Sequence, residues 1–89
     1  MKVIWKYTLY DDGIICTLLI PRGGKILTSQ IQNGIPRIWV LVDPNDEKEM
    51  RKFIVYGTGH TLSDDPGKYI STVQEGRFVW HIFEITNVG

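Results

Sequence analysis

The chain has few residues of the kinds that form disulfides, metal centres and general bases. It contains one cysteine and two histidines among 89 residues. Cys16 has no second cysteine to pair with and lies in the apolar run 14–20, so we expect a buried, unreactive thiol. Neither His60 nor His81 has a second potential ligand at short spacing, and one cysteine allows no zinc-binding spacing. The sequence therefore predicts no metal site and no cofactor.

Groups for catalysis are also scarce. No serine lies in a nucleophile-elbow pattern. The adjacent carboxylates Asp64 and Asp65 precede a Pro-Gly pair, an arrangement typical of a turn. Residues 60–62 fit one half of the paired His-x-Thr arrangement of two-histidine phosphoesterases, but residues 81–83 lack the hydroxyl of the other half. We therefore expect no catalytic residues and a protein that is not an enzyme.

The sequence also lacks an excess of one charge and a long apolar run. Ten Lys and Arg balance ten Asp and Glu, which argues against binding to duplex nucleic acid or to an anionic membrane through a general field. No stretch approaches the roughly 20 apolar residues of a membrane span, and residues 1–6 contain no long apolar signal region. We expect a cytosolic protein. The zero net charge does little to keep copies apart, so self-association is permitted.

What is present is enough apolar material for one core. Hydrophobic residues make up 43% of the chain, which at this length predicts a single domain over residues 1–89. Turn-forming residues divide the chain into short apolar stretches, and the seven breaks indicate about seven strands. These breaks are at residues 12–13, 21–24, 33–34, 43–46, 57–59, 65–67 and 75–76. Asn33-Gly34 is the strongest, because both residues accept the positive φ of a type I′ hairpin turn.

Within the stretches, apolar and polar residues alternate with the period of a strand. Residues 3–9 have one apolar face, and in residues 37–43 the apolar Ile38, Val40 and Val42 share a face. In the stretch 26–32, the pattern places Ile26, Thr28, Gln30 and Gln32 opposite Leu27, Ser29 and Ile31.

Two further stretches depart from this simple alternation. The last, 78–85, is apolar on both faces, so we expect a central strand or an interface strand. Residues 46–52 have no apolar stripe and are expected to form a charged hairpin loop rather than a helix. The sequence therefore predicts an all-β fold, an antiparallel meander with sequential strands adjacent, closed into a small sandwich or barrel.

The most unusual local run is Tyr56, Gly57, Thr58, Gly59 and His60. Two glycines allow close approach to the backbone, while a hydroxyl and an imidazole offer hydrogen-bond donors, so the run could hold a phosphate or a ribose. The alternative is structural: the glycines only bend the end of a strand and the histidine bonds a local carbonyl.

Other candidate ligand contacts are aromatic or cationic. The chain has ten aromatic residues, more than one small core needs, and exposed rings can stack on bases. Core packing or contact between subunits is the alternative for each ring. We select Trp39, Tyr69 and Arg77 as candidates, the arginine because a guanidinium pairs well with a phosphate.

The sequence resembles a family of short bacteriophage proteins of unknown function over nearly its whole length. The resemblance rests on residues 4–6, 30–34, 41–44, 56–60 and 78–84. The usual pattern has Pro after Gly-His and Pro-Cys-Leu-Trp in the fourth stretch, where this chain has Thr61 and Pro36-Arg37-Ile38-Trp39. These departures would alter a ligand site at those positions.

Small β-rich phage proteins of this size are similar to the oligomeric sponges that sequester immune nucleotides of the CBASS and Thoeris systems. This resemblance implies a non-enzymatic homo-oligomer, in the cytoplasm of the infected bacterial host, that holds a cyclic dinucleotide or a cyclic ADP-ribose species. The alternative is a phage structural or adaptor module that binds another protein through exposed aromatic residues.

Overall fold

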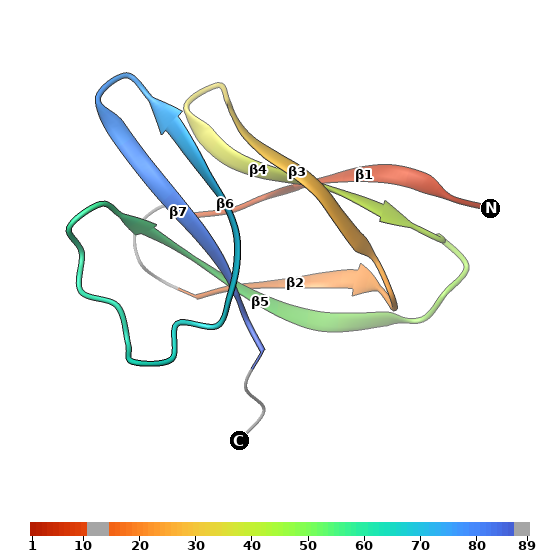
Figure 1. Cartoon of the computed structure of the whole chain (residues 1–89). Coiled ribbons are helices and arrows are strands. Elements are labelled where there is room, and N and C mark those ends of the chain that lie inside the picture. Colours follow the sequence, from red (N-terminus) through yellow and green to blue (C-terminus); the bar gives the residue numbers. More distant parts are fainter. Residues whose placement is uncertain (11–14, 87–89) are drawn as a thin grey trace.

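The chain forms two antiparallel sheets (Figure 1). A computed structural model describes residues 1–10 and 15–86, and the turn expected at residues 12–13 lies outside this part. The seven strands are β1 (Val3–Thr8), β2 (Cys16–Pro21), β3 (Lys25–Gln32), β4 (Ile35–Val42), β5 (Lys48–Gly57), β6 (Lys68–Glu75) and β7 (Phe78–Ile85). No helix that could span a membrane is found among the described residues. The prediction of an all-β sandwich of about seven strands is confirmed.

The connectivity differs from a continuous meander. The strand order is β1-β4-β3 in one sheet and β2-β5-β7-β6 in the other. Within residues 1–10 and 15–86, sequential strands pair only in the hairpins β3–β4 and β6–β7. The predicted adjacency of all sequential strands is therefore wrong, because the chain passes three times from one sheet to the other and because β7 lies between β5 and β6. Each sheet needs its apolar face covered, and these crossings bring the two faces together.

The hairpin between β3 and β4 is confirmed. Asn33 has φ 54° and Gly34 has φ 76°, the two positive values that a type I′ turn requires. Gln32 pairs directly with Ile35 across this turn. The local sequence signal was sufficient here because the turn chemistry alone sets the register.

The core lies between the sheets. Ile38, Val40 and Val42 of β4 are at most 1% exposed, which confirms the alternation predicted for this strand. The facing sheet contributes residues from all four of its strands, among them Phe53 and Ile82, both 0% exposed. β7 lies between β5 and β6, as its two apolar faces predicted.

Cys16 belongs to this core. It is 3% exposed, and its sulfur accepts a hydrogen bond from the Tyr10 backbone N–H at 3.1 Å. The burial predicted for this thiol is confirmed.

Two local predictions were wrong. A bulge in β3 shifts the register between Ile26 and Thr28, so Leu27 is 44% exposed and Ile26 packs against the core, as Ile31 does. The regular alternation predicted for this strand therefore fails. The charged segment expected to form a hairpin loop is instead largely strand, because β5 begins at Lys48 and pairs with β2 from there.

Candidate ligand-binding site

A tight turn follows β5 and is closed by the side chain of His60. The His60 N–H donates to the Gly57 carbonyl at 3.1 Å, and the Gly57 N–H donates to His60 Nδ1, also at 3.1 Å. Because Nδ1 accepts this bond, the neutral imidazole carries its proton on Nε2. Gly59 adopts φ +89° within the turn. The backbone thus fixes the ring and leaves the Nε2–H available.

The pairing of β5 with β7 brings a second segment against this turn. Gly57 is the register partner of Trp80, and the Thr58 N–H donates to the Val79 carbonyl at 3.2 Å. The two segments together line an open cavity of about 420 Å³. Its lining consists of Gly57, Thr58, His60, Arg77, Phe78, Val79 and Trp80.

Two stacked aromatic rings form one side of this cavity. The centroids of Phe78 and Trp80 are 6.0 Å apart, and their planes differ by 15°. Phe78 is 56% exposed, whereas Nε1 of Trp80 is buried without a hydrogen-bond partner in the described part of the chain. Arg77, directly before this pair, is exposed. A flat apolar surface therefore lies beside a cation and two hydrogen-bonding side chains.

A line of hydrogen bonds supports the hydroxyl of Thr58 from behind. Thr58 Oγ1 lies 2.7 Å from His81 Nε2, and His81 Nδ1 lies 3.0 Å from Thr72 Oγ1. The Thr72 hydroxyl is in turn 2.7 Å from Tyr69 Oη. Both ring nitrogens of His81 are thus engaged, and His81 acts as a bridge between two hydroxyls.

The structure brings half of the predicted site residues together. Gly57, Thr58, His60 and Arg77 line one cavity. Gly59 lies in the adjoining turn, where a Cβ atom would have no neighbour within 4 Å. The structural alternative expected His60 to bond a carbonyl. The backbone N–H of His60 does donate to the Gly57 carbonyl, but its side chain accepts a hydrogen bond from the Gly57 N–H instead.

The remaining candidates lie elsewhere. Tyr56 and Tyr69 both make edge contacts with Phe83, with centroid distances of 5.9 and 5.6 Å. Tyr69 connects with Thr58 only through the hydrogen-bond line. Trp39 belongs to the other sheet, where it lines a separate hollow with Ile4 and Leu27.

Phe78 and Trp80 belong to this site but are not among the residues predicted from the sequence. The sequence signal for them is their i, i+2 spacing directly after Arg77 and a turn. That spacing places two rings on one face of a strand beside a cation. The pairing with residues 57–58 is non-local and leaves no local signal.

Gly57 is fixed by packing within its own chain. A Cβ atom there would lie 2.9 Å from His60 Cε1 and 3.2 Å from a ring carbon of Trp80. The missing side chain therefore makes room for these two rings rather than for open solvent.

The described residues contain no group of three or more His, Cys, Asp or Glu side chains that could hold a metal ion. No curated protein and no solved structure matches the chain. The family model described as Domain of unknown function (DUF7352) matches residues 1–88, and the chain belongs to this family.

Proposed function

We propose that the protein is a non-enzymatic sponge that binds a small cyclic nucleotide, of the cyclic dinucleotide or cyclic ADP-ribose type, and removes it from solution. In this proposal it acts in the cytoplasm of an infected bacterium, against nucleotide-based defence. The observation that carries the proposal is the stacked pair of Phe78 and Trp80 beside Arg77 in one cavity with His60 and Thr58.

Each part of a nucleotide finds a suitable group in this cavity. The exposed face of Phe78 offers a stacking surface for a base, a contact worth about 1–3 kcal/mol per base. Arg77, the Nε2–H of His60 and the hydroxyl of Thr58 are donors for phosphate oxygens. The cavity volume of about 420 Å³ lies within the range of roughly 300–1,000 Å³ typical of small-molecule sites.

Self-association is part of the proposal. Leu19 and Met50 are register partners on neighbouring strands and are 58% and 69% exposed. Tyr69, in the same four-stranded sheet, is 55% exposed. A second copy of the chain would remove this apolar area from water, and the zero net charge of the chain offers little resistance.

Titration calorimetry with cyclic dinucleotides and cyclic ADP-ribose isomers tests the proposal. A micromolar or tighter complex is expected, from which heating releases the ligand intact. Phe78→Ala should weaken binding at least tenfold, whereas Tyr10→Ala, which truncates another exposed ring outside the cavity, should not. The proposal fails if no nucleotide binds, if the recovered ligand is cleaved, or if both variants bind equally well.

A second candidate function is an adaptor that binds another protein. The hollow of about 280 Å³ on the three-stranded sheet favours it, because Ile4 and Leu27 are 57% and 44% exposed beside Trp39. Trp39→Ala should then abolish recovery of a stoichiometric protein from infected cells and leave nucleotide binding unchanged. Recovery of a nucleotide alone, with no protein at stoichiometric amounts, would argue against the adaptor.

A further inference from the structure

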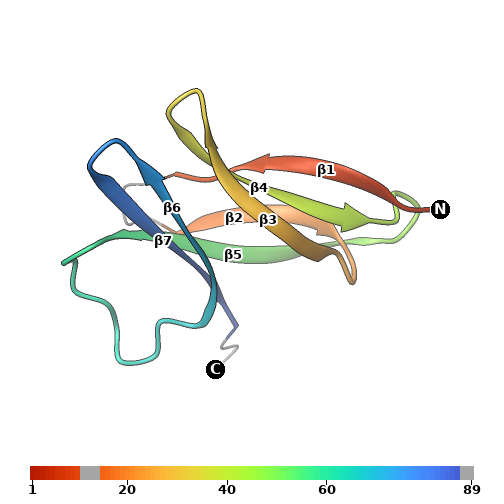
Figure 2. The same cartoon turned by 45° about the horizontal axis from the view of Figure 1, so that its top comes forward.

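A second cavity lies at the seam where the two sheets meet. β3 and β6 are end strands of different sheets and lie side by side in both views (Figures 1 and 2). The hydroxyls of Ser29 and Ser71 form a hydrogen bond across the seam. Each strand also carries a bulge, between Ile26 and Thr28 in β3 and between Tyr69 and Ser71 in β6.

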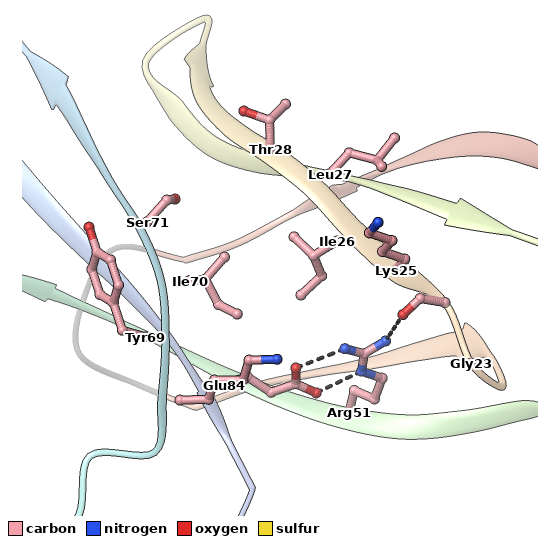
Figure 3. Close-up of a pocket in the computed structure, with 12 residues that line it drawn as sticks. Gly23, Lys25, Ile26, Leu27, Thr28, Arg51, Tyr69, Ile70, Ser71 and Glu84 are labelled. Atoms are coloured by element: carbon pink, nitrogen blue, oxygen red, sulfur yellow. Dashed lines mark hydrogen bonds and ion pairs between the residues drawn. The ribbon is translucent and has the colours of Figure 1, made fainter.

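The two bulges lie at the same end of the seam and border a cavity of about 550 Å³. Bulges bend strands and re-aim side chains, and they are frequent next to binding sites. Ile26 and Ile70 extend into this space from opposite strands (Figure 3). The cavity therefore has aliphatic walls on both sides.

The floor of this cavity is formed by an ion pair whose two charges balance each other. Arg51 Nε donates to Glu84 Oε2 at 2.6 Å, and Nη2 donates to Oε1 at 2.8 Å (Figure 3). Arg51 Nη1 donates to the Gly24 carbonyl at 2.6 Å. The negative charge of Glu84 is thus balanced, and it does not compete for other cations.

Two lysines remain as uncompensated charge. Lys25 and Lys68 line the cavity from the two strands, and both are exposed. Neither forms an ion pair with any residue in the ranges 1–10 and 15–86. The lining therefore contains three cationic side chains and one anionic side chain, and the positive excess comes from these lysines.

We propose that this cavity is a binding site for a small amphipathic organic anion, with its acidic group at Lys25 and Lys68 and its aliphatic body between Ile26 and Ile70. The excess positive charge selects an anion over a neutral molecule or a cation. The aliphatic walls select a ligand with an apolar body over inorganic phosphate or acetate. This site is separate from the one proposed for the nucleotide, so either proposal can fail alone.

Chemical-shift mapping on the ¹⁵N-labelled chain with sodium octanoate as the probe tests the site. Octanoate should shift the amides of residues 23–28 and 68–71, leave residues 57–60 and 77–80 unchanged, and bind at least tenfold more tightly than octanol, acetate or phosphate. Equal binding of octanol would overturn the role of the lysines, and equal binding of acetate would overturn the role of the walls. Absence of shifts at both cavity strands would overturn the site.

A charge-matched pair of variants completes the test. Lys25→Gln with Lys68→Gln should weaken octanoate binding at least tenfold. Lys2→Gln with Lys52→Gln removes the same charge at exposed positions outside the cavity and should change affinity less than twofold. Equal weakening in both double variants would mean that only net charge matters and would overturn the proposal. Unchanged spectra outside the substituted strands would show that both variants fold.

Discussion

Arg51 and Glu84 are joined by two parallel hydrogen bonds between the neighbouring strands β5 and β7. The side chains are only 17% and 12% exposed. The hydrogen bonds that Arg51 donates to Glu84 raise the pKa of Arg51 above its usual value, although burial alone would lower it. Burial of this kind is tolerated because both charges are paired and the third donor of Arg51 reaches Gly24.

Removing one member of this ion pair should destabilise the fold more than replacing both members by apolar residues. Glu84→Gln leaves a buried guanidinium with one anionic partner fewer, and we expect the free energy of unfolding to fall by about 3–5 kcal/mol. Arg51→Met combined with Glu84→Leu removes both charges, so the free energy of unfolding should fall clearly less than in Glu84→Gln. Urea denaturation of the single and double variants measures the difference. A double variant at least as unstable as the single one would contradict this prediction.

Tyr7→Phe should leave the protein equally stable or stabilise it by about 1 kcal/mol at neutral pH. The hydroxyl of Tyr7 is buried and has no hydrogen-bond partner in the described part of the chain. The comparison is thermal or urea unfolding, with Tyr10→Phe as the exposed control. A loss of stability at Tyr7 alone would show that its hydroxyl does have a partner.

The same residue predicts a dependence on alkaline pH. Burial raises the pKa of Tyr7, and the opposing effect of Arg51 is smaller. Above about pH 10 the unfolded tyrosine ionises while the folded one stays protonated, so the unfolded state binds fewer protons and stability falls as the pH rises. Tyr7→Phe should reduce this loss, measured as the difference in melting temperature between the two proteins from pH 8 to pH 11. If the melting temperatures of the two proteins fall in parallel as the pH rises, the raised pKa of Tyr7 is contradicted.

The glycines of the turn after β5 should respond differently to alanine. Gly57→Ala places a methyl group against the rings of His60 and Trp80 and should cost about 1–3 kcal/mol. Combining it with His60→Ala should recover part of this loss, because the nearest clashing atom is removed. Gly59→Ala meets open space but retains φ +89°, so only backbone strain of roughly 1–2 kcal/mol is expected. Melting temperatures of these three variants, compared with that of the unsubstituted protein, establish the order of stability.

His81 should influence ligand binding without touching the ligand. His81→Ala releases the hydroxyl of Thr58 and is expected to weaken nucleotide binding about three- to tenfold, the loss of roughly one hydrogen bond. Tyr69→Phe, at the far end of the same hydrogen-bond line, should have a smaller effect. Calorimetry on folded variants provides the measurement. Wild-type affinity in His81→Ala would remove His81 from the site.

Local signals predicted those features of the fold that depend on neighbours in sequence. Asn33-Gly34 specified its own turn, and the alternation of Ile38, Val40 and Val42 specified a buried face. The bulge at Leu27 could not be predicted, because it inserts one residue into a pattern that otherwise reads as regular. The strand at Lys48 was not predicted because its charged residues find partners far away in the sequence: Glu49 pairs with Arg22, and Arg51 pairs with Glu84.

The candidate site was predictable only in part for the same reason. Thr58 and His60 come from an unusual local run, and Arg77 was selected for its charge. Their convergence depends on the register of β5 against β7, in which Gly57 is opposite Trp80. Composition cannot specify such a register. It also could not show that Trp39 lies in the other sheet, apart from the candidate residues that line the cavity.

The order of the strands along the chain affects how this protein emerges from the ribosome. Among the described strands, β1 pairs only with β4 and β2 pairs only with β5, so both wait for partners that are made much later. The first hairpin that can close is β3–β4. Until then two apolar strands are exposed with unpaired edges, a state prone to association with other nascent chains. The rate of synthesis and the supply of chaperones should therefore have a larger effect on the yield of folded protein than the stability of the folded state has.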